Sequence, residues 1–567
     1  MVGLKGIVIS AASGTADTPR AHITNMAALE CLRDIGLEDE LLKLSSSGDH
    51  HMMHTRWCHS MAGMEYARIY SWGNDPKRKG DYETASPCSP IDLPQTLLEP
   101  ILVRHAIKTG FSVRFNTSLI SFAVENPPNG PITATVHDNL TNIDYKIHTD
   151  YLFGADGARS QVVKQLDLPL TKKPGQGLAI NVLVKADLSH LVQYRTGNLH
   201  WVMQPDKDHP DFGWMAIVRM VKPWTEWMFI FFPDRKCNNA RDLNPGRQEY
   251  LARVREFIGD ETPAEILDVS KWVINEVVAE RHPPLNGLGS NTCIQDAFNL
   301  AWKIAYVHRG LARPSLLDSF SEERQPVGQS VIARANQALR DHVQIWEALG
   351  LLSGDVSTRR EILRELESAT TEGSQRRRKL REGIMHTAHE FHGLGVEMNQ
   401  HYTSEAIYTA DETHSYKIEG RATDDKVLFH EPGTYPGCRL PHVWLNKAVP
   451  AQPISTIDLA GHGAFTLFTG IGGAQDWRDA AARVSTSLGV EIGVHSLGFR
   501  QDWEDVYYHW ESVRGVQESG AVLVRPDRVV AWRAERVLED GEACERKLRS
   551  VMESILGLSG VREVKDI

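Results

Sequence analysis

Several common features are missing from this sequence, and each absence excludes a class of protein. No apolar run approaches the ~20 residues that a membrane-spanning helix needs. The seven cysteines are dispersed and form no C-x-x-C pair, a pattern typical of reduced thiols in a cytoplasmic protein. The first ten residues are a poor signal peptide. The net charge of −11 lacks the positive excess that bulk binding to nucleic acid or to an anionic membrane requires.

A recognisable metal-ligand set is also missing. His50, His51, His54 and His59 lie near Cys58, but no acidic or thiolate set completes a known pattern. We therefore predict no metal. The chain of 567 residues, 41% hydrophobic and 24% charged, is globular in composition and long enough for three to four domains.

Local patterns predict mixed α/β organisation. Residues 6–10 are expected to form a short buried strand, residues 25–35 a helix that ends at Gly36, and residues 45–90 a loop-rich stretch. A second helix is expected from Pro94 to Gly110, followed by hairpin strands and, over 151–165, a strand, a Gly-rich turn and a helix start. Later elements are five strand candidates within 175–280, charged helices over 318–400, a Pro/Gly-rich connector over 401–450, and a compact unit whose strands begin at 455–460.

Four segments carry residues suited to ligand binding, although each also has a structural explanation. The turn at 154–160 contains Asp156, which either accepts from a ribose or ribityl hydroxyl or holds the turn. The prolines and glycines of 281–291 either let the backbone approach a flat ligand or form a rigid connector with a capped helix. The loop at 18–22 carries Arg20 and His22, and Gln95 opens the second helix.

The order of these segments resembles the class A flavoprotein aromatic monooxygenases, in the branch of phenol and chlorophenol hydroxylases. The similarity lies in TPRAHITN, PQTLLEPIL, GADGARS and HPPLNGLGSNTCIQDAFNLAWKIA, and the C-terminal GAVLVRPDRVVAWRA resembles the thioredoxin-like domain of that branch. The resemblance implies an α/β fold, mixed α+β in character. A Rossmann-like FAD-binding domain, incomplete here, would hold an inserted antiparallel-sheet substrate domain and be followed by a thioredoxin-like domain.

The same resemblance predicts domain limits. These are an FAD-binding first part at 1–170, a substrate-binding sheet at 171–280, FAD-binding return loop and helices at 281–400, a connector at 401–450 and a thioredoxin-like domain at 451–567.

The resemblance further implies that FAD is reduced by NADPH or NADH, and that dioxygen then hydroxylates a small phenolic substrate. It assigns no phenol-activating base, and it suggests a homodimer. The expected FAD contacts are Arg20, Gln95, Asp156, Pro284, Asn286, Gly287, Leu288 and Gly289. The expected substrate-pocket residues are Trp201, Trp214, Trp227 and Phe231, although such aromatics more often form a core.

Two departures from the family pattern concern the cofactor. The family begins with a strand and G-x-G-x-x-G, whereas here Gly3 and Gly6 supply neither. The family also has a strand ending in Gly-Asp before the HPPLNG segment, whereas here Glu280 is followed directly by Arg281-His282. The sequence therefore predicts a truncated or mis-spliced form of a hydroxylase. Two alternatives stay open: a catalytically inactive paralogue that acts as a binding or assembly protein, and a non-oxygenase dehydrogenase on the same scaffold.

Overall fold

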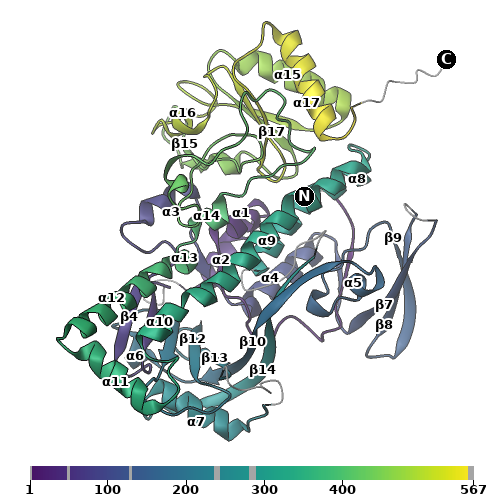
Figure 1. Cartoon of the computed structure of the whole chain (residues 1–567). Helices are drawn as coiled ribbons and strands as arrows, with labels where there is room; N and C mark the ends of the chain where they lie inside the picture. The colour runs from purple at the N-terminus through teal and green to yellow at the C-terminus, as the bar shows by residue number, and fades with distance from the viewer. Residues whose placement is uncertain (1–2, 47–51, 127–129, 235–242, 280–288, 560–567) are drawn as a thin grey trace.

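The computed structural model describes residues 3–46, 52–126, 130–234, 243–279 and 289–559. Figure 1 shows a large sheet at the bottom, the C-terminal domain at the top, and the long helices α8 and α9 between them. The helices are α1 (Met26–Asp34), α2 (Glu38–Leu44), α3 (Lys79–Ala85), α4 (Gln95–Lys108), α5 (Gln161–Gln165), α6 (Ser189–Val192), α7 (Arg247–Ile258), α8 (Gly289–His308), α9 (Asp318–Asp341), α10 (Val343–Ala348), α11 (Val356–Glu367), α12 (Thr371–His386), α13 (Ala388–Phe391), α14 (Leu394–Met398), α15 (Ala474–Leu488), α16 (His509–Val513) and α17 (Gly541–Ile555).

The strands fall into several sheets of different size. They are β1 (Ile7–Ile9), β2 (Ile23–Thr24), β3 (His54–Cys58), β4 (Glu65–Tyr70), β5 (Ile91–Asp92), β6 (Ser112–Arg114), β7 (Thr117–Val124), β8 (Ile132–Asp138), β9 (Ile143–Thr149), β10 (Leu170–Lys185), β11 (Leu199–Met203), β12 (Met215–Lys222), β13 (Glu226–Phe232), β14 (Glu265–Ala279), β15 (Trp444–Leu445), β16 (Ile454–Ser455), β17 (Phe465–Thr469), β18 (Ile492–Ser496), β19 (Ala521–Val524) and β20 (Val530–Ala534).

The largest sheet contains the five strands expected between 175 and 280, in the order β14-β10-β13-β12-β11-β3-β4. Its pairings are antiparallel except for β11 and β3, which run parallel. The stretch 45–90, expected to be loop-rich, also contains β3, β4 and α3, which the sequence patterns did not indicate. Strand β3 is recruited by pairing with β11, a long-range contact that leaves little signal in a short, partly charged segment.

Both faces of this sheet are covered. Helix α7 contributes Val254 and Phe257 to the core on one face, together with Phe229 of β13. On the other face, α10 and α12 pack against Trp57 and Trp201. Burial on both sides explains why β11–β13 read as nearly continuous apolar and aromatic runs.

The N-terminal strand differs from expectation because it is exposed. Among the described strands, β1 pairs with β6 alone, and its Ile7 and Val8 are 43% and 48% exposed. Residues 151–156 were expected to begin with a strand but have no regular structure. A strand needs a hydrogen-bonded neighbour, and the described part of the chain offers residues 151–156 none.

Helix α1 forms where its capping signals predict. The Asn25 side chain accepts a hydrogen bond from the Ala28 N–H at 3.0 Å, and Gly36 has the positive φ of +76° that favours glycine after a helix. Sheet order in the C-terminal domain is β18-β17-β19-β20, with β17 and β18 parallel and the other pairs antiparallel. Helices α15 and α17 cover one face, which is a thioredoxin-like arrangement. The strand expected at 455–460 is only the two-residue β16, followed by a 3-10 turn.

Within the described ranges, no helix combines the length and the apolar character needed to cross a membrane.

Candidate active site

Backbone pairing brings two of the predicted segments together. Strands β2 and β5 pair antiparallel, the Leu93 N–H donates to the His22 carbonyl at 2.7 Å, and the Gln95 N–H donates to the Ala21 carbonyl at 2.9 Å. The loop that carries Arg20 and His22 is thereby fixed against the start of α4.

Helix α8 begins at the same place. The Asn291 side chain accepts from the Asn25 N–H at 3.0 Å and donates to the Ile23 carbonyl at 2.9 Å. The N-termini of α1, α4 and α8 therefore converge, and none has an acidic side chain in its first turn. Three positive helix ends in one place favour a negatively charged ligand or reaction centre.

A buried histidine–carboxylate pair lies beside these helix ends. The Nδ1 atom of His22 is 3.5 Å from Oδ1 of Asp92, and both side chains are 1% exposed. Asp92 also accepts a hydrogen bond at 2.5 Å from the side chain of Asn198, which precedes β11. The Nε2 atom of His22 is buried and has no hydrogen-bond partner among the described residues.

The two members of this pair have pKa values suited to proton transfer. Burial is the main cause that lowers the pKa of His22, with the charge of Arg219 adding to it. Burial alone would raise the pKa of Asp92, but its contacts with His22, Arg219 and Asn198 outweigh that effect and lower it. At neutral pH the imidazole is therefore neutral and the carboxylate ionised, which is the combination of a general base.

The large sheet supplies a cation that faces this pair. Arg219 lies on β12, and burial lowers its pKa despite the charges of Asp92 and Glu390. Burial also raises the pKa of Glu390, on α13, to about 7. The sequence analysis missed Asp92, Arg219 and Glu390. The only signal was a single arginine inside the apolar strand MAIVRMVK.

The predicted FAD contacts are only partly described. Arg20 is exposed on its loop, Gln95 is half-buried at the start of α4 with its amide donating to Glu99, and Gly289 is the buried first residue of α8. Pro284, Asn286, Gly287 and Leu288 lie outside the described residues.

Asp156 is engaged in its own turn. Its carboxylate accepts from the Ser160 hydroxyl at 2.5 Å and from the Gln161 N–H at 2.6 Å, at the start of α5. Burial alone would raise its pKa, but these hydrogen bonds lower it. The same carboxylate would have to give up lone pairs to bind a ribityl hydroxyl.

The four predicted substrate aromatics divide between the two faces of the large sheet. Trp201 stacks on His342 with ring centroids 3.8 Å apart, and Trp214 meets Trp346 edge to face at 5.3 Å. Trp227 and Phe231 lie in the other core, against α7. The structure therefore groups the first two with α9 and α10, and separates them from the second two.

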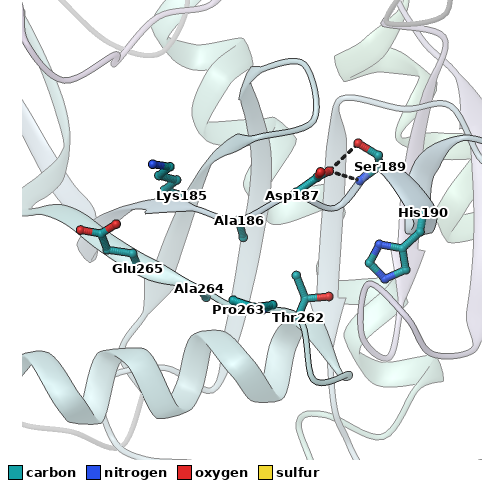
Figure 2. Close-up of a pocket in the computed structure, with 9 residues that line it drawn as sticks. All are labelled: Lys185, Ala186, Asp187, Ser189, His190, Thr262, Pro263, Ala264 and Glu265. Atoms are coloured by element: carbon teal, nitrogen blue, oxygen red, sulfur yellow. Dashed lines mark hydrogen bonds between the residues drawn. The ribbon is translucent and has the colours of Figure 1, made fainter.

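A surface hollow of about 600 Å³ lies at one end of β10 and β14. Figure 2 shows its lining, in which Asp187 accepts from both the hydroxyl and the N–H of Ser189. None of the predicted site residues lines it.

Comparison with known proteins gives a family for both parts of the chain. Residues 1–335 match the model of an FAD binding domain, and residues 433–558 match the model of an aromatic-ring hydroxylase C-terminal domain. A 2,4-dichlorophenol 6-monooxygenase from Delftia acidovorans is 39% identical over 98% of this chain and 94% of its own. A phenol 2-monooxygenase from a Pseudomonas species is 37% identical over 95% of this chain and 87% of its own.

Solved structures agree with this grouping. The flavin-dependent monooxygenase PieE, solved with FAD and substrate, matches with a TM-score of 0.89 and 35% identity over 98% of this chain and 95% of its own. The chain belongs to the family of FAD-dependent aromatic-ring hydroxylases, and its cofactor is FAD.

The two ends of FAD fit the described residues unequally. The three helix N-termini and the buried His22–Asp92 pair fit the flavin-ring end, where negative charge develops. At the pyrophosphate end, Gly6 is explained by packing, because a Cβ there would lie 2.5 Å from the Phe111 ring. The described residues are therefore suited in charge to the flavin-ring end of the cofactor.

Proposed function

We propose that this protein hydroxylates a small phenolic substrate, using FAD, NADPH or NADH, and dioxygen. The reaction consumes one phenol, one dioxygen, one reduced nicotinamide and a proton, and it yields a dihydroxylated ring, water and the oxidised nicotinamide. The observation that carries the proposal is the buried His22–Asp92 pair at the convergence of three helix N-termini.

In this proposal the base is His22. An ionised phenol is a much better nucleophile at carbon than a neutral one, so the phenol proton must be removed. The unpartnered Nε2 of His22 accepts that proton, and Asp92 stabilises the imidazolium that forms. The helix N-termini favour the phenolate, and burial of the pair keeps water away.

Bound FAD supplies the reducing equivalents from the nicotinamide and activates dioxygen. We propose that Arg20, Gln95 and the first turn of α8 at Gly289 position its ring system, and that Trp201 and Trp214 belong to the wall on the substrate side. Asp156 is also a proposed contact of FAD, which requires its carboxylate to release the Ser160 hydroxyl. The domain limits given above, a homodimer and a cytoplasmic location also remain proposals.

The test is a turnover assay with excess FAD, reduced nicotinamide, a panel of phenols and isotopically heavy dioxygen. We expect phenol to stimulate nicotinamide oxidation and the product to carry one heavy oxygen. Hydrogen peroxide as the only product, or dehydrogenation without oxygen incorporation, would reject the proposal.

A pair of histidine variants tests the assigned base. His22→Gln should retain FAD binding and lose most hydroxylation of phenols. The matched control is His59→Gln, because His59 also contacts a carboxylate, that of Asp206 at 2.7 Å, but lies just after β3, which ends at Cys58. Equal losses in the two variants would contradict the role of His22.

A further inference from the structure

The connection between β19 and β20 projects three buried charged side chains from the C-terminal domain toward the rest of the chain. Arg525 donates from Nη1 and Nη2 to the two carboxylate oxygens of Glu323 on α9, at 2.6 and 2.8 Å. Its Nε also donates to Asp527 at 3.0 Å. Arg525 and Glu323 are both 0% exposed, so these bonds exclude water.

The same connection holds helix α8. The Asn299 amide donates to Glu323 at 2.7 Å and to Asp527 at 2.9 Å. Lys303, one turn further along α8, donates to Glu323 at 2.8 Å and is itself 0% exposed. Asn299 and Lys303 of α8 therefore bind the Glu323 carboxylate, which Arg525 of the C-terminal domain also binds.

The connection between β19 and β20 also contacts helix α1. Arg528 donates from Nη1 to the Glu30 carbonyl and from Nη2 to the Asp34 carboxylate, both at 2.8 Å. Figure 1 shows the C-terminal domain seated over this part of the molecule. One short connection thus contacts two helices that are far apart in the sequence.

These two helices are the ones whose N-termini meet at the candidate active site. Asn299 lies ten residues into α8, about 15 Å from its first turn at 1.5 Å per residue. Glu30 lies little more than one turn into α1. A helix is stiff over these lengths, so fixing its middle fixes where its N-terminus points.

We propose that residues 525–528 are positioning residues for the active site: the C-terminal domain sets the relative placement of α1 and α8, and through them the geometry at Asn25 and Asn291. A buried ion pair adds little to the free energy of unfolding, because the cost of desolvating the two charges offsets their attraction. Their bidentate, directional bonds instead specify one arrangement of the two helices. This role gives the domain a function that needs no thiol chemistry.

The test compares Arg525→Gln with Arg533→Gln by amide hydrogen exchange in the FAD-free chain, with no phenol present. Arg533 is a matched control, because it lies on β20 and forms a bidentate pair with Glu412 at 2.8 and 2.7 Å without contacting α1 or α8. We expect Arg525→Gln to accelerate exchange about tenfold in the first turns of α1 and α8, and to leave the strands of the C-terminal domain unchanged.

FAD titration provides a second readout. Arg525→Gln should weaken FAD binding about tenfold, equivalent to ~1.4 kcal/mol, while Arg533→Gln should not. Arg528→Gln should accelerate exchange in α1 but not in α8, which a general loss of stability would not do. If Arg525→Gln does not fold, the double variant Glu323→Gln/Arg525→Met takes its place, because it removes one charge of each sign and leaves Lys303 and Asp527, whose charges are also opposite.

Three results would overturn the proposal. They are exchange that rises uniformly over the chain in the arginine variants, exchange at the starts of α1 and α8 that stays at the wild-type rate, and an Arg533→Gln variant that behaves like Arg525→Gln. Because none of these measurements uses a phenol or product, failure here leaves the proposed hydroxylation untouched, and the reverse also holds.

Discussion

Replacing Asp92 by asparagine should remove the charge that makes His22 an effective base. At the 3.5 Å that separates the two side chains, an ionised carboxylate stabilises an imidazolium by about 5 kcal/mol for an effective dielectric constant near 20. That is about three and a half pKa units at 1.36 kcal/mol per unit. Burial and the charge of Arg219 act in the opposite direction on the pKa of His22. We therefore expect hydroxylation of a phenol with a pKa of about 10 to fall roughly 100-fold at pH 7.

The assay is kcat/KM as a function of pH, for one ordinary phenol and one acidified by electron-withdrawing substituents. The variant should recover as pH rises, because solution then supplies the phenolate, and it should lose far less with the acidic phenol. The control is Asp458→Asn, which removes a carboxylate paired with Arg33 on α1 but away from His22. A variant that loses both phenols equally, or keeps the wild-type pH profile, would refute the reasoning.

Three further outcomes are expected. The 567-residue chain should bind FAD about one to two decades more weakly than a version with a Gly-Asp strand inserted before the HPPLNG segment, since one charge-assisted bond to FAD is worth roughly 1.5–3 kcal/mol; equal FAD affinity of the two versions would contradict this. Residues 450–567 should not reduce insulin disulfides, because they contain a single cysteine, Cys544, and burial raises the pKa of its thiol; measurable turnover would count against it. Burial raises the pKa of Glu397 to about 8. The folded protein therefore loses stability as pH rises from 4.5 to 8, because the unfolded chain ionises this carboxyl freely and the folded chain does not. Glu397→Gln should raise Tm at pH 9 more than at pH 6, and an equal shift at both pH values would oppose this explanation.

Local signals were enough to predict the elements that depend on them. The helix at 25–35 followed from the Asn25 cap and Gly36, and the five strands within 175–280 followed from their composition. Strands β3 and β4 could not be found in this way. Arg56 of β3 and His200 of β11 are 144 residues apart, and only the folded sheet brings them together.

The candidate site shows the same division. Arg20 and Gln95 were predicted because they stand in segments with a recognisable pattern, and backbone hydrogen bonds bring these segments together. Their contact with FAD stays a prediction. Asp92 and Arg219 stand in segments with no motif of their own. They were identified by their electrostatic contacts with His22, which join the β2–β5 pair to β12 of the large sheet, and a single sequence contains no record of those contacts.

The contact between Arg528 and Glu30 can form only late in the synthesis of the protein. These residues are 498 positions apart, so at roughly 5–20 residues per second the ribosome needs about 25–100 s to deliver the second after the first. During that interval the side of α1 that Arg528 will contact has no C-terminal domain to cover it. The last tenth of the chain therefore supplies the Arg528 contacts to the first helix, and under the proposed role of residues 525–528 the active site reaches its final geometry only when translation is nearly over.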